Sequence, residues 1–532
     1  MKKTFALAWL CLLPFFVSAQ QFTQTVRGTV TDASNNEPLI GVEVAVYQGD
    51  SLLTGNTTDI DGNFEILNVP VGRYRVEFSY IGKEKITEEI EVRSARENFL
   101  EASLQDAPEN LDVIEVRAKL GEPVNPVPVA SGTTITPAQI ELSTANAGDM
   151  GRFAMALPGV QATRDTRSDI IIRGNSPVGL LWRLEGIDIP NPNHFARRGS
   201  SGGGITIFSL SMLDRSDFST GAFAPEYGNA FSGVFDVRFR KGNNQTREYT
   251  FKAGILGLDF ATEGPFKQGG ASYSMNYRYS TLGILNSIGL HLVGERIDNT
   301  FQDFSFKLNF PGKKPGNNIS VWGIGGLSTE KQRPSDTLAT FSDFATYSFT
   351  TNMGAMGLSH TWSISDSSLL KTSFAVMGQQ VVVQDDTVNL ELKPTLINRE
   401  DFINSRISAS TIYSKQISSR LGFKAGLFAS NLIYNLQHDS LSFVNFQSQE
   451  VLSEQGNTFL LQPFFQYSYQ SNSIWRFYIG AHAMYLALNN TYAVDPRAGL
   501  LLATGTQSTL SLAYGLHSRI LPIGTYFTQV ED

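Results

Sequence analysis

The fold is decided by four short segments: Asp169-Ile-Ile-Ile-Arg-Gly174, Leu184-Glu-Gly-Ile-Asp-Ile-Pro190, Gly221-Ala-Phe-Ala-Pro-Glu-Tyr-Gly228 and Gly233-Val-Phe-Asp-Val-Arg-Phe-Arg240. Runs of β-branched residues alternate in this region with Gly, Pro and Asn. That pattern is typical of short strands joined by tight turns. We therefore expect a small mixed domain over residues 129–243. The exception is a helical stretch from Pro137 to about Leu157, with Thr136 as its N-cap.

From about Gln245 onward the pattern changes to long runs in which apolar and polar residues alternate. Tyr273, Met275, Tyr277 and Tyr279, for example, alternate with Ser274, Asn276 and Arg278. An apolar, aromatic face opposite a polar face is what a transmembrane barrel strand requires. A soluble β-sandwich would show a similar alternation, but the length of the runs and their aromatic content favour the barrel. Residues 244–532 would supply roughly 12–14 antiparallel strands at about 20–25 residues per strand and connection.

The composition agrees with a mainly β protein that exposes apolar surface. Of the 532 residues, 17 % are charged and 11 % are aromatic, and the formal net charge is −8. A sequence pI near 5.4 argues against nucleic acid as a partner, because binding to phosphates needs a basic face.

The first 19 residues predict a secretory signal peptide. Met1-Lys2-Lys3 is followed by an apolar run and then by Val17-Ser-Ala19 before Gln20. The apolar run is shorter than the ~20 residues that span a membrane. The single cysteine, Cys11, lies within this segment, so the exported chain is expected to have no thiol, no disulfide and no cysteine-bound metal.

Residues 21–105 read as a small β-sandwich of short alternating strands, for example Val42-Glu-Val-Ala-Val46 and Gly72-Arg-Tyr-Arg-Val-Glu-Phe78. Asp59 and Asp61 could bind calcium. A tight hairpin turn at Asp59-Ile-Asp-Gly-Asn63 is the interpretation that we favour.

A proline-rich linker follows over residues 106–128. It contains a short β-prone run whose centre is Asp112, Val113, Ile114, Glu115 and Val116. An extended segment with unpaired N–H and C=O groups can add as a strand to a partner protein. The alternative is that this run is the first strand of the domain that follows.

The segment over residues 169–241 resembles the plug domain of TonB-dependent outer-membrane receptors. The resemblance rests on the Ile-Arg-Gly strand, an acidic residue before Gly186, and the closing Pro-Glu-Tyr-Gly segment; where the family more often has Asp, this chain has Glu185. The matching plug residues are Arg173, Gly174, Glu185, Gly186, Glu226, Tyr227 and Gly228. Residues 21–105 resemble the carboxypeptidase-regulatory-like domain, a transthyretin-like fold that often precedes the plug in receptors from Bacteroidetes. The motifs are Gly28…Asp32…Pro38-Leu39…Gly41, Asp61-Gly62-Phe64 and Gly72…Tyr74.

This resemblance implies a receptor in the outer membrane of a Gram-negative cell. Such a receptor takes up a scarce ligand, which could be a siderophore, a cobalamin, a glycan or a peptide. Asp112–Val116 would be the TonB box, which pairs with a TonB-type energy-transducing protein in the periplasm. Arg197 and Arg198 are candidate contacts to the ligand or to the barrel lumen. We expect no catalytic residue, cofactor or metal; the alternative function is an exported β-domain surface-binding or adhesion protein without transport.

The length of the chain does not suit a whole receptor of this kind. A barrel that holds a plug has roughly 22 strands, which exceeds the number expected here. We therefore expect only part of a barrel, as in a truncated receptor. The alternative is a small barrel with the plug outside it.

Overall fold

The structure is a computed structural model that describes residues 22–33, 38–93, 97–105, 132–143, 148–164, 167–254, 257–314, 316–335, 344–365, 367–388, 393–418, 420–442, 447–471, 475–505 and 508–528. The expected signal peptide and the Asp112–Val116 segment lie outside these ranges. The chain divides into two compact units, one of which runs essentially to Leu104, while the other begins at Gln105. We describe each unit by itself.

The N-terminal unit contains two antiparallel sheets. One has the order β4–β1–β7 and the other the order β3–β2–β5–β6. Their strands are β1 (Thr23–Asp32), β2 (Glu43–Gln48), β3 (Ser51–Thr57), β4 (Asn63–Pro70), β5 (Gly72–Ser79), β6 (Ile86–Val92) and β7 (Asn98–Leu104).

Both sheets contribute to one apolar core. Val26 and Phe64 come from the first sheet, and Val76 and Phe78 from the second. The predicted sandwich is therefore confirmed. The Asp59–Asn63 segment is a tight turn, because the Asp59 carboxylate accepts hydrogen bonds from the N–H groups of Asp61 and Asn63 at 2.9 and 2.8 Å.

The second unit begins with the plug, whose central sheet has the order β12–β11–β16–β15–β8. β11 and β16 are parallel, whereas the other neighbours are antiparallel. The plug strands are β8 (Gly132–Ile135), β9 (Val160–Arg164), β10 (Arg167–Ile172), β11 (Leu180–Leu184), β12 (Ile187–Ile189), β13 (Asn193–His194), β14 (Ile205–Thr206), β15 (Ser216–Ser219) and β16 (Gly233–Val237).

The helical stretch expected from Pro137 to Leu157 is two short helices, α2 (Pro137–Leu142) and α3 (Met150–Ala154). Thr136 caps α2 as predicted, in a capping box with Gln139. One continuous helix was wrong because Gly148 has a φ of +73°, which a right-handed helix does not contain.

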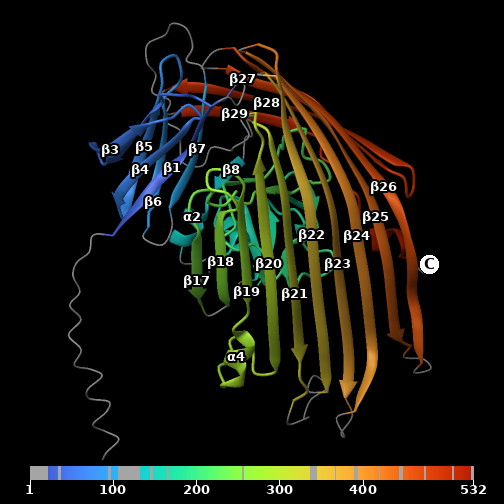
Figure 1. Ribbon diagram of the computed structural model, residues 1–532. Coiled ribbons are helices and arrows are strands. Elements are labelled where there is room, and N and C mark those ends of the chain that lie inside the picture. The colour runs from blue at the N-terminus through green and yellow to red at the C-terminus, as the bar shows by residue number, and fades with distance from the viewer. Residues whose placement is uncertain are drawn as a thin grey trace, which may run out of the picture. The chain divides into compact units, whose positions relative to one another are not determined.

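After the plug comes an antiparallel meander in which each strand pairs with the next, from β17 to β29. Within the described residues this sheet has 13 strands, as the sequence predicts. Figure 1 shows the long strands β20 to β26 standing side by side. The strands are β17 (Glu248–Ala253), β18 (Leu258–Pro265), β19 (Ser272–Tyr279), β20 (Ile297–Pro311), β21 (Asn318–Gln332), β22 (Ala345–Ser365), β23 (Ser368–Val388), β24 (Pro394–Gln416), β25 (Leu421–Leu441), β26 (Ser448–Gln470), β27 (Trp475–Leu486), β28 (Thr491–Gly505) and β29 (Ser508–Gly515).

The connection after β19 differs from the expectation. It contains a short helix, α4 (Leu282–Ser287), where the sequence showed no helical periodicity. Leu282 of α4 is buried beside Phe301 of β20, and this tertiary contact leaves no periodic signal in so short a segment. Among the described residues, none of the helices is long and apolar enough to cross a membrane.

The plug packs on one face of the 13-stranded sheet, which we call the inner face. Trp182 and Phe235 of the plug share a core with Trp322 and Met353 of the sheet. The plug is therefore packed against the sheet. On β19 the polar residues Ser274 and Asn276 are buried, whereas Tyr277 and Tyr279 are exposed. The apolar row thus faces outward and the polar row faces the plug, as expected for a barrel wall.

The outward face of β26 shows how far this apolar band extends. Six successive outward residues are apolar: Phe459, Leu461, Pro463, Phe465, Tyr467 and Tyr469. They cover about 33 Å of strand at ~3.3 Å per residue, enough for the ~25 Å apolar band of an outer-membrane barrel at the usual tilt. Toward the start of β26 the outward residues become Asn457, Gln455 and Ser453.

At the same height along the strands, where the outer face changes from apolar to polar, the inner face becomes more apolar. Beside the apolar band it carries Ser408, Ser430 and Gln462 together with Phe428 and Phe464, whereas past the band it carries Phe402 and Leu436. Past the band, β24 and β25 therefore carry apolar residues on the inner face, while β26 carries polar residues on the outer face. Residues 516–528, which follow β29, cover part of this apolar inner face.

Candidate functional site

The interface between the plug and the inner face holds most of the plug residues predicted from the sequence. Glu185 and Gly186 form the two-residue turn between β11 and β12, and their φ angles are +53° and +89°. Two left-handed residues in succession are typical of a type I′ hairpin. The turn points the Glu185 carboxylate toward the 13-stranded sheet, which we call the wall. Its Oε1 accepts hydrogen bonds from Lys307 Nζ of the wall and from the Phe239 N–H of the plug, both at 2.8 Å.

This ion pair is inside the protein, since the side chains of Glu185 and Lys307 are each only 8 % exposed. Burial by itself would raise the pKa of Glu185. The positive charges of Lys307 and Lys371 outweigh burial, so the pKa of Glu185 lies below its ordinary value. Lys307 Nζ also donates to the carbonyl of Phe239 at 2.7 Å. Lys307 of the wall thus binds both a side chain of the plug, Glu185, and a backbone carbonyl, that of Phe239.

A second contact involves the loop Ala224–Gly228, which contains the predicted Glu226, Tyr227 and Gly228. Arg497 Nη1 of β28 donates to the carbonyls of Ala224 and Tyr227, at 2.8 and 2.5 Å. The His482 ring of β27 bonds through Nδ1 to the Pro225 carbonyl at 2.9 Å. Three carbonyls of one short loop are therefore held by two wall side chains.

The Glu226 carboxylate of the same loop meets a lysine of the wall. Its Oε2 lies 2.9 Å from Lys424 Nζ of β25. Burial would raise the pKa of Glu226, but Lys424 and Arg183 lower it. Two buried acids of the plug are thus paired with lysines of two well-separated strands.

Gly228 is required where the loop meets the wall. A Cβ atom at this position would lie 1.9 Å from His482 Nε2 and 2.7 Å from Gln462 Oε1. His482 is 1 % exposed and already bonded to Pro225, so it has little room to move. The absence of a side chain at residue 228 lets the loop dock.

We predict that Gly228→Ala destabilises the docked plug by about 1–3 kcal/mol, the usual cost of overpacking. Denaturant unfolding and protease cleavage of the loop would measure this effect. Gly354→Ala is the matched control, because its Cβ would have no neighbour nearer than 4.0 Å. Since His482 is the obstacle, adding Gly228→Ala to His482→Ala should cost little more than His482→Ala alone. Additive costs would contradict this account.

Sequence reasoning missed Arg183, which organises the plug side of this interface. Its Nε lies 2.8 Å from Asp188 Oδ1, and its guanidinium lies over the rings of Tyr227 and Phe428, 4.7 and 4.6 Å from their centroids. The available signal was an arginine within the apolar run Leu180-Leu-Trp-Arg-Leu184. A buried arginine in a strand needs an acid, and Asp188 is the residue opposite it in β12.

A further missed contact joins His194 to the wall. His194 Nε2 lies 2.9 Å from Asp303 Oδ2 of β20, and the same oxygen lies 2.7 Å from Arg278 Nη2. Burial lowers the pKa of His194 in spite of the neighbouring carboxylate. Nothing in the local sequence pairs residues so far apart along the chain.

The remaining predicted residues lie elsewhere. Arg173 and Gly174 form the turn that ends β10, with φ angles of +50° and +79°, and the Arg173 side chain is exposed. Arg197 and Arg198 lie on an exposed plug loop. Arg198 lies 3.5 Å from Glu400 and over the Phe402 ring, while Arg197 lies over the Phe349 ring. The structure thus brings Glu185, Gly186 and Glu226–Gly228 together at the inner face. They lie near the ends of β20, β23 and β25 where the connections between strands are short. Arg197 and Arg198 lie near the opposite ends of the strands, where the connections are longer.

Comparison with known proteins gives a family for the N-terminal unit. Residues 26–116 match the family model described as the CarboxypepD_reg-like domain. The match extends beyond β7 and includes the candidate TonB-box residues. No curated protein matches the chain.

Solved structures resemble the chain over about three quarters of its length. The siderophore receptor PirA from Acinetobacter baumannii is 14 % identical with a TM-score of 0.52, covering 74 % of this chain and 62 % of PirA. The outer membrane transporter YddB from Escherichia coli is 13 % identical with a TM-score of 0.53, covering 76 % of this chain and 64 % of YddB. P. aeruginosa FpvA, solved with heterologous pyoverdines, is 12 % identical with a TM-score of 0.53, covering 73 % of this chain and 57 % of FpvA.

The chain therefore spans less than two thirds of the length of these three proteins. At such low identity the likeness shows the fold alone. That fold confirms the resemblance found in the sequence: this chain has the plug-and-wall fold of outer-membrane receptors, with a CarboxypepD_reg-like domain ahead of it.

Proposed function

We propose that this chain is a TonB-dependent outer-membrane receptor that takes up a scarce small ligand. The observation that carries the proposal is the polarity of the wall. An inner face with buried polar residues holds a plug through one buried and one partly buried ion pair, while the outer face carries an apolar, aromatic band of the height of a membrane. A surface adhesion module has no need of either feature.

The longer connections lie at one end of the sheet, after β19 and β21, and by the usual rule this end faces outward. Arg197 and Arg198 reach the same half of the wall, so we place the ligand site there. The PirA and FpvA structures favour a siderophore among the ligands considered, which also include a cobalamin, a glycan and a peptide. A TonB-type protein would pull on Asp112–Val116 from the periplasm, and the chain itself would make and break no covalent bond.

The experiment expresses the chain in a Gram-negative host and follows its location and uptake. A receptor should appear in the outer-membrane fraction, migrate on gels in a heat-modifiable way, and accumulate a radiolabelled ferric siderophore only while the proton gradient is intact. A chain recovered as a soluble exported protein would overturn the proposal in favour of adhesion.

A second prediction tests the lipid-facing band directly. Phe465 is 47 % exposed and lies in the middle of the apolar row of β26. Phe465→Arg should therefore destabilise the membrane-inserted state by about 2–4 kcal/mol, the cost of arginine near the bilayer midplane. Unfolding from lipid vesicles would measure this cost.

The control is Gln455→Arg on the same strand, because the outward face is polar there. That change should cost less than about 1 kcal/mol, as for a residue near or beyond the membrane surface. Equal effects of the two substitutions would show that the Phe465 row does not face lipid.

A further inference from the structure

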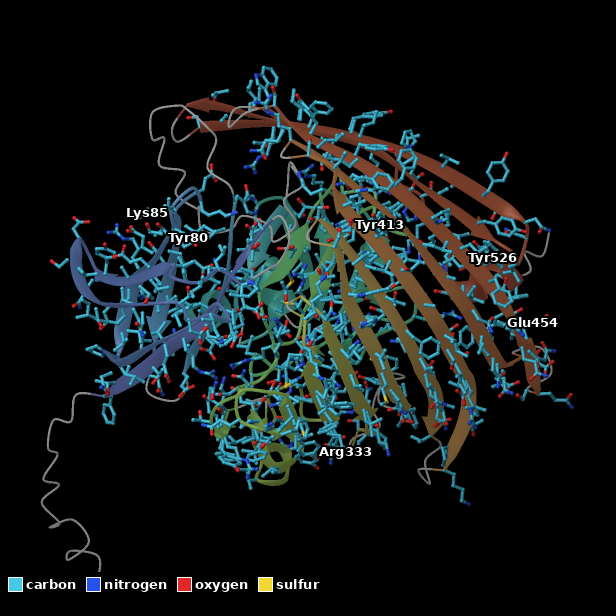
Figure 2. The ribbon with its side chains drawn as sticks, turned by 45° about the horizontal axis from the view of Figure 1, so that its top comes forward. Tyr80, Lys85, Arg333, Tyr413, Glu454 and Tyr526 are labelled. Atoms are coloured by element: carbon cyan, nitrogen blue, oxygen red, sulfur yellow. The ribbon has the colours of Figure 1, made fainter. Side chains whose placement is uncertain are left out.

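Three buried oxygen atoms on neighbouring residues of β19 and β20 have no hydrogen-bond partner within the described part of the chain. They are Asn276 Oδ1, Asp303 Oδ1 and Ser305 Oγ. The three residues are at most 2 % exposed, so they lie inside the protein. Arg333, which is labelled in Figure 2, follows the end of β21, the next strand after β20 in the wall. Buried polar atoms nearly always have a partner, so three such oxygens on neighbouring residues indicate a bound group.

The strand register places the three residues next to one another on the inner face. Asn276 of β19 lies directly opposite Ser305 of β20, and Asp303 precedes Ser305 by two residues on the same face. The Cβ atoms of directly opposed residues are about 4.5–5.5 Å apart, and those of diagonal neighbours about 7–8 Å. All three side chains are therefore within reach of one small ligand between them.

Hydrogen bonds to β18 fix the direction of the Asn276 amide. Asn276 Nδ2 donates to Asp259 Oδ1 at 2.9 Å and to the Phe260 carbonyl at 3.2 Å, and both acceptors belong to β18. Because β19 lies between β18 and β20, an amide nitrogen that faces β18 turns Asn276 Oδ1 toward β20.

The Asp303 carboxylate is also bonded on one side only. Its Oδ2 accepts from Arg278 Nε and Nη2, at 2.8 and 2.7 Å, and from His194 Nε2 at 2.9 Å. All of the donors found for this carboxylate among the described residues meet the same oxygen. Oδ1 is left to bind a group that the chain itself does not supply.

The charge around these oxygens favours a cation. The side chains bonded to Asn276 and Asp303 are those of Asp259, Arg278 and His194. With an uncharged His194, the cluster holds two carboxylates and one guanidinium, which leaves one negative charge. A water molecule can donate to two of the three oxygens, but it leaves this buried charge uncompensated.

The set of oxygens suits a monovalent cation. Carboxylate and carbonyl oxygens are ligands for hard cations. Calcium takes about 6–8 oxygen ligands, whereas this cluster offers a single carboxylate oxygen beside one amide and one hydroxyl oxygen. In the described ranges no group of three or more His, Cys, Asp or Glu side chains is placed to hold a metal ion. One positive charge is also what the cluster needs for neutrality.

The plug closes the cluster from the other side. Gly326 of β21 is directly opposite Asp303, and a Cβ at Gly326 would lie 2.5 Å from Ile207 Cγ2 and 2.9 Å from His194 Cε1. Arg278 Nη2 also donates to the Thr206 carbonyl of the plug at 2.6 Å. The cluster is therefore complete and shielded only while the plug is docked on the wall.

We propose that Asn276, Asp303 and Ser305 bind a monovalent cation between the wall and the plug, and that this ion stabilises the docked plug. The sequence predicts no metal site, because amide and hydroxyl ligands from two strands form no motif. Binding of the ion and docking of the plug are coupled, so movement of the plug away from the wall releases the ion. The inference does not depend on uptake.

The test compares the stability of the purified chain, in detergent, in sodium chloride and in N-methyl-D-glucamine chloride at equal ionic strength. Denaturant unfolding with proteolysis of the plug gives the equilibrium constant for docking. Each tenfold rise in sodium above its dissociation constant should raise this constant about tenfold. The sodium NMR line should broaden on addition of the chain. Equal stability in the two salts would overturn the proposal and assign water to the site.

Ser305→Ala separates a bound ion from an unused hydroxyl. Without an ion, loss of a hydroxyl that has no partner should leave the sodium dependence unchanged, whereas loss of a ligand should weaken sodium binding at least about threefold. Ser232→Ala is the matched control, because Ser232 Oγ is also buried and without a partner among the described residues. It should keep the full sodium dependence.

An unchanged sodium dependence in Ser305→Ala would reject these residues as the ligands. The titration of the wild-type chain needs no variant, so it decides the existence of the ion even where Ser305→Ala folds poorly. Loss of uptake with an intact sodium dependence would overturn the proposed function and retain the cation site.

Discussion

Lys307→Met should lower the free energy of unfolding of the plug–wall assembly by about 3–5 kcal/mol, the cost of leaving one member of a buried ion pair without its partner. Glu185 is 7 % exposed, and two of its hydrogen bonds, from Lys307 and from Phe239, end on the same oxygen. Without Lys307, the carboxylate keeps the Phe239 N–H and the more distant charge of Lys371. Denaturant unfolding followed by plug-specific proteolysis would measure the loss.

Two controls identify the cause. Lys415→Met removes an exposed lysine from the wall and should change the stability by less than about 0.5 kcal/mol. Lys307→Met/Glu185→Gln removes both charges and should recover a large part of the loss, because no buried ion remains. A double variant no more stable than the single one would show that the pair is not the source of the effect.

The loss should also depend on pH. The pKa of Glu185 is lowered in the folded chain, so its ionised form adds stability above the unfolded pKa of about 4.3, and that contribution disappears as the pH falls. In the Lys307→Met variant the pKa of Glu185 rises toward the value that burial favours. The gap in stability between wild type and variant should therefore narrow as the pH is lowered toward 4. A gap independent of pH would contradict the assignment of the effect to this charge.

Deleting Asp112–Val116 should abolish energy-dependent uptake and leave ligand binding intact. These five residues are a β-prone run within a proline-rich linker, suited to strand addition by a periplasmic partner. The measurement pairs uptake by cells with ligand binding by the purified chain. Deletion of residues 121–125 shortens the same linker equally and should preserve uptake.

Ile114→Pro provides a gentler form of the same experiment. Proline removes one N–H group from the segment and should reduce uptake strongly if the segment pairs as a strand. The CarboxypepD_reg-like match includes these residues, so the melting temperature of the N-terminal unit must be shown to be unchanged. Uptake at the wild-type rate after the deletion would reject the segment as the coupling site.

Periodic patterns explain why so much of the fold could be predicted. Along β19, Tyr273, Met275, Tyr277 and Tyr279 alternate with Ser274, Asn276 and Arg278. This alternation indicates which face of the strand meets the plug, because side chains alternate strictly along a strand. The strand count followed from length and spacing alone. Local chemistry was also sufficient for the Thr136 cap and for the Asp59–Asn63 turn, since both depend on residues within four positions of one another.

The candidate site was predicted only on its plug side. Glu185 and Glu226 were named from their motifs, but Lys307 and Lys424 could not be named as their partners, since 122 and 198 residues separate them along the chain. His482 and Arg497 bond to backbone carbonyls, which carry no sequence signal. One helix over residues 137–157 was wrong for a related reason, because the left-handed Gly148 reflects the tertiary path of the chain.

The position of β8 in the plug has a mechanical consequence. Among the described residues β8 is the first plug strand, and it lies at the edge of its sheet, where it pairs with β15 through four residue pairs from Ser216–Ile135 to Ser219–Gly132. A load transmitted along the linker therefore falls first on this short ladder, while Glu185 and Glu226 still tether the centre of the plug to the wall. The plug would therefore begin to unfold at the β8 edge of its sheet. The force needed to start this unfolding would depend on those four residue pairs and not on the whole interface between plug and wall.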